Sequence, residues 1–174
     1  MHGLMSSERT LPVAATALTA TVAVYTALVA FGNVTDFGTN REFVRHVLAM
    51  DTTFLDDDLM WRAVTDRTLQ DAAYVAVIVW ETVAALALLW ATALWLRGLV
   101  RPWAGYGPAR RASTVGLVML MLLFGLGFMA IGGEWFAMWQ STKWNGLQAA
   151  GRDFTLAGFV LVLIHLPSSQ WRRE

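Results

Sequence analysis

One segment limits the possible folds of this chain more than any other. Residues 72–96 form an apolar run of 25 residues in which Glu81 is the only charged side chain. A helix of this length spans a bilayer, whose hydrocarbon core requires roughly 20 apolar residues. An acidic side chain at that depth costs roughly 2.5–3.5 kcal/mol. Because other groups must offset this cost, we expect Glu81 to lie in a polar site between helices.

Three further apolar segments complete a membrane-spanning pattern, at residues 11–31, 114–139 and 147–166. The last spans only if its helix begins near Gly146 and accommodates Arg152 and Asp153. Charged residues make up 15% of the chain, against about a quarter in soluble domains. We predict an all-α polytopic membrane protein, in which a single domain holds four transmembrane helices and residues 33–71 form an extracytoplasmic helical loop.

The distribution of arginine predicts an orientation. Residues 97–113 carry four arginines, and both chain ends are basic (Arg97, Arg101, Arg110 and Arg111; Arg9, Arg172 and Arg173). Basic residues concentrate on the cytoplasmic side of membrane proteins. We therefore expect both termini in the cytoplasm and the loop 33–71 outside. Tryptophans are expected at the outer interface (Trp61, Trp135, Trp139 and Trp144) and at the inner one (Trp95, Trp103 and Trp171).

The loop 33–71 contains helix signals of its own. Thr39 and Glu42 have the spacing of a capping box, which predicts a helix with Thr39 as its N-cap. An apolar stripe follows (Phe43, Val44, Val47, Leu48 and Met50), so this helix is expected to lie along the membrane interface or over the bundle. A second helix start is expected at Asp58, which precedes Arg62 by four residues and leads toward the run 72–96.

The most distinctive stretch, residues 132–146, mixes glycine, tryptophan and polar side chains. Its members line a polar-aromatic cavity or form an interfacial belt (Glu134, Trp135, Trp139, Gln140 and Asn145). Glu81 and Glu134 both fall in the outer half of the predicted bundle, where two carboxyl groups that share one site can share a proton. Tyr74 is placed to donate a hydrogen bond to Glu81. Additional candidates for the same ligand or ion site are Trp80, Arg45, His46 and Asp51.

Composition limits the chemistry. Without cysteine, the chain has no disulfides, thiolate nucleophile or thiolate-ligated metal. The three histidines offer little for a metal site, and His46 and His165 are expected at opposite membrane faces, too far apart to ligate one haem. The acidic residues Asp56–Asp58 lack the spacing of a calcium loop, which favours a solvated turn. We assign no catalytic residue and no metal ligand, we leave the cofactor unknown, and the zero net charge gives no reason to expect nucleic acid.

Two stretches carry a family resemblance, namely Phe43-Val44-Arg45-His46-Val47-Leu48-Ala49-Met50-Asp51-Thr52 and Gly132-Gly133-Glu134-Trp135-Phe136-Ala137-Met138-Trp139-Gln140-Ser141. With Glu81 and Trp144-Asn145-Gly146, they resemble the bacterial family of predicted small integral membrane proteins of unknown function. The resemblance covers nearly the whole chain, and Glu-Trp-Phe-x-Met-Trp-Gln-Ser is its most specific part. It implies a four-helix inner-membrane protein and implies no activity.

Three functions remain open at this point. The first is a non-enzymatic subunit or partner of a larger membrane assembly, or a homo-oligomer, which docks through the tryptophan-rich outer surface in addition to its contact with the lipid bilayer. The second is a permeation protein for protons, cations or small molecules that uses Glu81 and Glu134. The third is a membrane enzyme with a carboxylate–His site, in which the acids act with His46 and Asp51.

Overall fold

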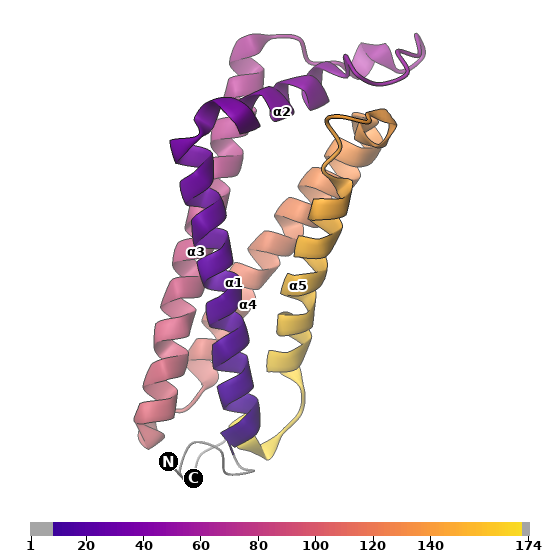
Figure 1. The fold of residues 1–174 in the computed structure, drawn as a ribbon. Coiled ribbons are helices and arrows are strands. Elements are labelled where there is room, and N and C mark those ends of the chain that lie inside the picture. The colour runs from indigo at the N-terminus through magenta and orange to yellow at the C-terminus, as the bar shows by residue number, and fades with distance from the viewer. Residues whose placement is uncertain (1–8, 172–174) are drawn as a thin grey trace.

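A computed structural model describes residues 9–171 of the chain and shows a bundle of long helices with no strand in that range. The helices long and apolar enough to cross a membrane are α1 (Thr10–Thr35), α3 (Arg67–Val100), α4 with its continuation η4 (Gly107–Trp135), and α5 (Leu147–His165). A shorter helix, α2 (Phe37–Ala49), crosses one end of the bundle (Figure 1). The predicted all-α fold with four candidate spans is confirmed, including the start of the fourth helix next to Gly146.

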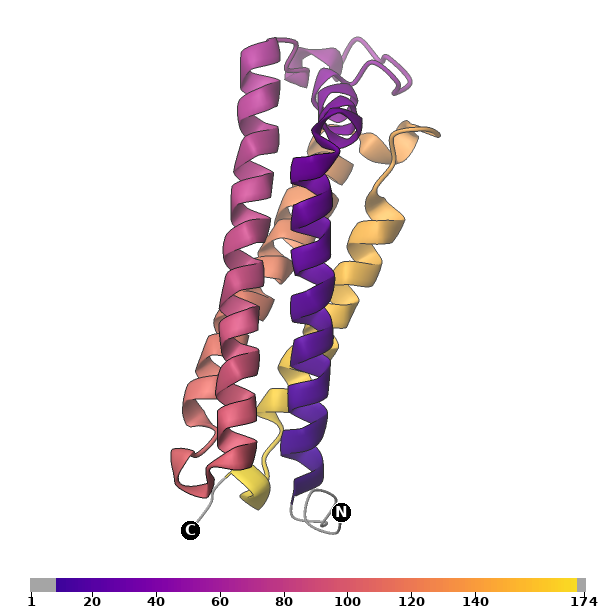
Figure 2. The same ribbon diagram turned by 60° about the vertical axis from the view of Figure 1, so that its left-hand side comes forward.

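The two ends of the bundle differ. One end, called the α2 end below, carries α2, the segment 50–66 and the segment 136–146, and the opposite end holds both ends of the described chain (Figures 1 and 2). At this second end, called the terminal end, Trp95 and Trp171 are buried, and the indole N–H of Trp95 donates to the hydroxyl of Ser113 at 2.9 Å. The interfacial role expected for Trp95 and Trp171 is therefore wrong. Arg172 and Arg173, used in the orientation argument, lie outside the described residues.

Two predicted helix starts are wrong. Helix α2 begins at Phe37, and Thr39 lies inside it, where its hydroxyl donates to the carboxylate of Asp36 at 3.0 Å. The helix expected from Asp58 does not form. Helix α3 instead begins at Arg67, because the carboxylate of Asp66 accepts the backbone N–H of Leu69 at 2.9 Å. An acidic cap of this kind satisfies one of the unpaired N–H groups of a helix N-terminus.

The segment between α2 and α3 is held close to the bundle. It contains a 3₁₀ turn, η2 (Met60–Arg62), and the backbone N–H of Val64 donates to the carbonyl of Leu48 at 2.8 Å. Asp56 accepts the backbone N–H of Asp58 at 3.0 Å, which is the turn that we favoured over a calcium loop. The side chain of Arg62 lies over the rings of Trp61 and Trp135.

The helix that starts at Gly107 changes its form and its partner along its length. Residues 107–121 form the α-helix α4, whereas Leu122–Trp135 form the π-helix η4, an unusually long run for a conformation that normally appears as a single turn. In α4, Gly116 lies directly against Leu88 of α3. In η4, Gly125 and Gly133 lie against Phe154 and Leu147 of α5. Small residues thus let α4 approach α3 closely and η4 approach α5 closely, and α4 also contacts α5.

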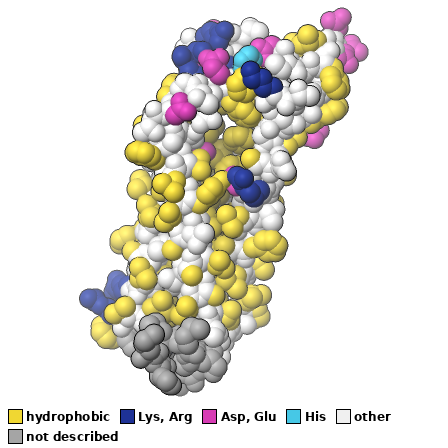
Figure 3. Space-filling view, in the orientation of Figure 1, with side chains coloured by type: hydrophobic (Ala, Val, Ile, Leu, Met, Phe, Trp, Pro, Cys, Tyr) yellow, Lys and Arg dark blue, Asp and Glu magenta, His cyan; other side chains and the backbone are white. Residues whose placement is uncertain are grey.

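This change of partner opens the bundle toward the α2 end. Helices α1 and α3 remain side by side, η4 follows α5, and the two pairs diverge (Figures 1 and 2). The space-filling view shows the surface hollowed between the α1 side and the α5 side, with acidic and basic side chains at mid-height (Figure 3). We call this region the crevice.

Candidate functional site

An apolar cavity occupies the α2 end of the crevice. Its volume is about 130 Å³, close to the roughly 150 Å³ of an engineered cavity that binds benzene. Its walls come from α2, α3 and η4 (Phe43, Val44, Val47 and Leu48; Ala73 and Val77; Leu123, Gly127, Phe128, Ile131 and Gly132, among others). The apolar face predicted for α2 therefore lies over the bundle and forms the roof of this cavity.

Glu81 lies one turn further along α3 than Val77, on the same helix face as Val77 and Ala73. Its side chain is only 3% exposed. The amide nitrogen of Asn33, near the end of α1, donates to Glu81 Oε2 at 2.6 Å. No other hydrogen bond or ion pair of Glu81 occurs within residues 9–171, so a neutral amide is the one polar group bound to this carboxyl.

Asn33 links Glu81 to the protein surface. Its side-chain oxygen accepts the amide N–H of Asn40 at 2.6 Å, and Asn40 is exposed on α2. The phenol of Tyr74 donates to the backbone carbonyl of Asn33 at 3.1 Å. The sequence predicted a hydrogen bond from Tyr74 to Glu81. Tyr74 instead binds the backbone of Asn33 and so positions the residue that binds Glu81.

A second buried acid is Asp153 of α5, which is 7% exposed. The phenol of Tyr25 donates to Asp153, with 3.0 Å to each carboxylate oxygen. Arg152 Nε donates to Asp153 Oδ1 at 2.9 Å, and Arg152 Nη2 donates to the phenol oxygen of Tyr25 at 3.0 Å. Sequence reasoning missed Asp153 as a site residue, although a pair of charges inside a predicted span is itself a functional signal.

Glu134 does not take the place expected for it. It lies near the end of η4, is exposed, and makes no hydrogen bond or ion pair with any described residue. The helix that carries it packs mainly against α5. Among the described residues, the acids buried in the bundle are Glu81 and Asp153.

Trp80, next to Glu81 in sequence, has a different role. Its indole N–H donates to the backbone carbonyl of Met119 at 2.9 Å, three residues before the π-helix begins. A change of hydrogen-bonding register along a helix frees backbone groups, and side chains can satisfy them inside a membrane. Trp80 therefore supports the backbone where α4 becomes η4.

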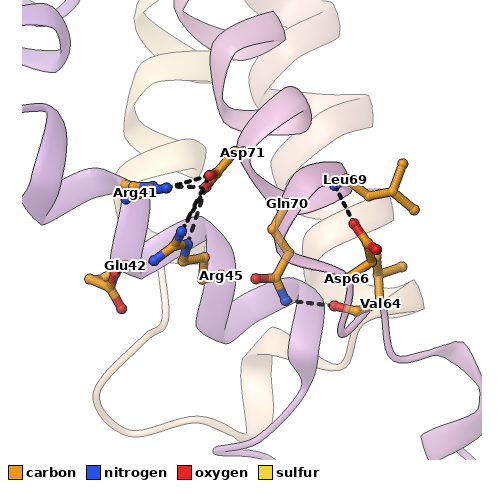
Figure 4. Close-up of polar contacts among 8 residues, drawn as sticks. All are labelled: Arg41, Glu42, Arg45, Val64, Asp66, Leu69, Gln70 and Asp71. Atoms are coloured by element: carbon orange, nitrogen blue, oxygen red, sulfur yellow. Dashed lines mark hydrogen bonds and ion pairs between the residues drawn. The ribbon is translucent and has the colours of Figure 1, made fainter.

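The basic candidates lie on α2 and are engaged there. Arg45 pairs with Asp71 and, at 2.9 Å, with Glu42, while Arg41 binds the same Asp71 carboxylate (Figure 4). The hydrogen bond to Asp71 raises the pKa of the Arg41 guanidinium above its ordinary value, so this group keeps its charge at every accessible pH. Asp71 joins α2 to the first turns of α3.

His46 and Asp51 meet each other at the α2 end. His46 Nδ1 lies 2.8 Å from Asp51 Oδ1, and the imidazole stacks on the ring of Trp144 with 4.7 Å between centroids. Neither residue hydrogen-bonds to Glu81. The structure thus does not assemble the carboxylate–His site of the enzyme hypothesis around Glu81, and within residues 9–171 no three His, Cys, Asp or Glu side chains are grouped to hold a metal ion.

The remaining candidates join residues 136–146 to residues 50–64. Gln140 accepts the backbone N–H of Phe54 at 2.9 Å, and the ring of Phe54 packs edge-on against Trp139. Trp135 packs edge-on against Trp61. Asn145 accepts the backbone N–H of Leu147, the first residue of α5, at 3.0 Å. Phe136 and Ala137 are buried with Met50 in a small core, so the two stretches that carried the family resemblance pack against each other.

Comparison with protein families supplies one match. The family model described as predicted small integral membrane protein (DUF2165) matches residues 11–167, which include every transmembrane candidate and both stretches at the α2 end. Searches of curated proteins and of solved structures found no match.

Proposed function

Starting from the fact that the chain belongs to the family of predicted small integral membrane proteins, we propose that it is a non-enzymatic membrane protein that binds a proton or a small cation at Glu81. The observation that carries this proposal is the environment of the carboxyl group. Glu81 is buried among the four long helices, and its hydrogen-bond partner is a neutral amide. A carboxyl group in such a place is either neutral, with a bound proton, or ionised and paired with a cation.

The neighbours of Glu81 support the same conclusion. Asp153 is a second acid buried in the bundle. The nearby cation, Arg152, is bound to Asp153 and Tyr25 and is not bound to Glu81. The chain of hydrogen bonds from Glu81 through Asn33 to the exposed Asn40 gives the site a polar connection to the α2 end. The site thus has negative charge, a polar connection and an apolar roof, which are the features expected of a proton or cation site in a membrane.

Infrared difference spectroscopy tests this function directly. With the protein in lipid nanodiscs, a change of pH or of cation concentration should produce a carboxyl signal that Glu81→Gln removes. Glu134→Gln is the matched control, since Glu134 is exposed and unpaired among the described residues, and it should leave that signal unchanged. A signal that persists in Glu81→Gln would contradict the proposal. Loss of cation or proton flux into liposomes in the same variant would extend it from binding to permeation.

A second candidate function, membership of a larger assembly, is favoured by a different observation. Four large aromatic side chains remain exposed at the α2 end although they are ordered by ring contacts with each other (Phe54, Trp61, Trp135 and Trp139). Ordered, exposed aromatic residues are typical anchors of protein interfaces. A pull-down in mild detergent should recover a stoichiometric partner that Trp61→Ser loses, whereas a lone monomer would count against this role.

We also place the protein in a bacterial inner membrane with both termini in the cytoplasm. The four arginines at the terminal end support this orientation (Arg97, Arg101, Arg110 and Arg111). A reporter that is active only in the cytoplasm should be active when it is fused to the C-terminus. A reporter that is active only outside the cytoplasm should be active when it is inserted at residues 55–58. The opposite pattern would reverse the orientation.

A further inference from the structure

A polar pocket separate from the crevice lies between α2, the segment 51–65 and the first turn of α3. Its volume is about 470 Å³, within the roughly 300–1,000 Å³ of ligand pockets. Its polar lining comes mainly from Glu42, Arg45, His46, Asp51, Arg67 and Gln70. We propose that this pocket binds a small zwitterion that carries a protonated amine and an anionic group.

The first argument is a buried acceptor without a donor. Gln70 is 2% exposed, and its amide nitrogen donates to the backbone carbonyl of Val64 at 2.7 Å. Its side-chain oxygen has no hydrogen-bond partner in the described structure, and Figure 4 shows this oxygen directed away from Val64. Turning the amide over would place two oxygens against each other at Val64, so the observed orientation is the favourable one. Because Gln70 lines the pocket, a ligand bound there is placed to supply the missing donor.

The second argument is the charge that remains free in the pocket. Arg67 is exposed and makes no ion pair or hydrogen bond with residues 9–171, and it lies three residues before Gln70 on the same side of α3. Arg45 is already neutralised by Asp71 and Glu42, and Asp51 is held by His46. Two polar side-chain groups of the pocket therefore have no partner in the described structure, the guanidinium of Arg67 and the buried amide oxygen of Gln70.

These two groups define the ligand. An anionic group suits Arg67, because guanidinium binds carboxylate and phosphate through paired N–H donors. An N–H donor suits the oxygen of Gln70. The second carboxylate oxygen of Glu42, which Arg45 leaves unbonded, favours a donor that carries positive charge. A simple anion would leave Gln70 unpaired, and a simple cation would leave Arg67 unpaired. A protonated amine joined to a carboxylate or phosphate satisfies both.

The position of the pocket suggests where such a ligand comes from. Gln70 lies two residues before the apolar run that starts at Ala72, so the pocket is at the level of the lipid head groups. The phosphoethanolamine head group of a membrane lipid and a free amino acid share the required chemistry, and both can reach this level.

Binding can be measured with soluble probes and the full chain in nanodiscs of phosphatidylcholine, whose head group has no N–H donor. Glycerophosphoethanolamine and glycine are titrated separately while the thermal unfolding midpoint is followed, and glycerophosphocholine serves as the matched probe without N–H groups. We expect a saturable rise of the midpoint with at least one of the first two and none with the choline compound. A stronger response to glycerophosphoethanolamine identifies the lipid source, and a stronger response to glycine identifies the free amino acid.

Arg67→Gln should weaken that binding by about tenfold or more without changing the unfolding midpoint of the free protein, since the side chain is exposed and unpaired in the described structure. Arg97→Gln, at the terminal end, is the control and should bind as the unaltered protein does. An equal response to the choline compound, no saturable response to any probe, or unchanged binding by Arg67→Gln would overturn the proposal and leave water as the occupant of the pocket.

Discussion

The contact between Gly116 and Leu88 fixes how closely α4 approaches α3, and Gly116→Ala tests it. A Cβ atom added to Gly116 would lie 2.6 Å from Leu88 Cγ and 2.8 Å from Leu88 Cδ2. Leu88 is completely buried, so its side chain has no free space into which it can move. The two helices would have to separate or Leu88 would have to leave its preferred rotamer.

The magnitude follows from two opposing effects. Overpacking of a dense core costs about 1–3 kcal/mol, whereas alanine in place of a helical glycine contributes about 0.5–1 kcal/mol of stability. Gly151→Ala isolates the second effect, because an added Cβ at Gly151 meets no atom within 4 Å. The difference in unfolding free energy between the two variants should therefore equal the clash alone, about 1–3 kcal/mol.

The assay is equilibrium unfolding in mixed detergent micelles, with helix content and tryptophan fluorescence as probes. Gly151→Ala should be at least as stable as the unaltered protein, and Gly116→Ala should be less stable than both. Equal stability of the two variants would refute the close approach of α4 to α3. Adding Leu88→Ala should remove the penalty of Gly116→Ala, since the atoms that clash are those of the leucine side chain.

Three further predictions concern single hydrogen bonds. A double-mutant cycle of Asn33→Ala and Glu81→Ala should give a coupling free energy of about 0.6–1.7 kcal/mol in the same unfolding assay; a value near zero would mean that the two side chains do not interact. Trp80→Phe should lower stability by about 0.5–1.5 kcal/mol because the carbonyl of Met119 loses its side-chain donor and keeps only the backbone N–H of Leu122. Trp90→Phe, at an exposed position with no hydrogen bond in the described structure, should change little. Asp66→Ala should cost about 1 kcal/mol and speed hydrogen exchange in the first turn of α3, and unchanged exchange there would argue against the cap.

The apolar runs of the sequence predict the four spanning helices of this fold. They do not predict the residues at which each helix begins and ends. Residues 72–96 required a spanning helix, because so long an apolar run has no other stable place. The true start of that helix, at Arg67, depended on whether Asp58 or Asp66 acts as the cap, and both have the right chemistry. The hydrogen bond from the backbone N–H of Val64 to the carbonyl of Leu48 holds residues 50–64 outside the helix, so Asp66 is the cap. That contact forms only when the chain folds.

The partners of Glu81 show a similar limit. A buried acid in a membrane span indicates a polar site, but it does not identify the other residues of that site. The sequence suggested Glu134 because both acids fall in the outer half of the predicted bundle. Beyond the change from α4 to the π-helix, that span packs mainly against α5 and Glu134 is exposed. The other acid buried in the bundle is Asp153. The four glycines within residues 122–135 predicted close helix packing in this span. They did not indicate which helix would be the partner.

The divergence of the two helix pairs also bears on how the chain enters the membrane. Helices α1 and α3, with α2 between them, form one hairpin, and α4 and α5 form another. Each hairpin satisfies its own backbone hydrogen bonds, and residues 101–106 alone connect the two along the chain. Insertion can therefore proceed as two units, with the seating of Leu88 on Gly116 as the late docking event. Two fragments separated at residues 101–106 would still contain every contact within each hairpin. They would associate in the bilayer through the contacts between the hairpins, such as Leu88 with Gly116 and Tyr25 with Asp153.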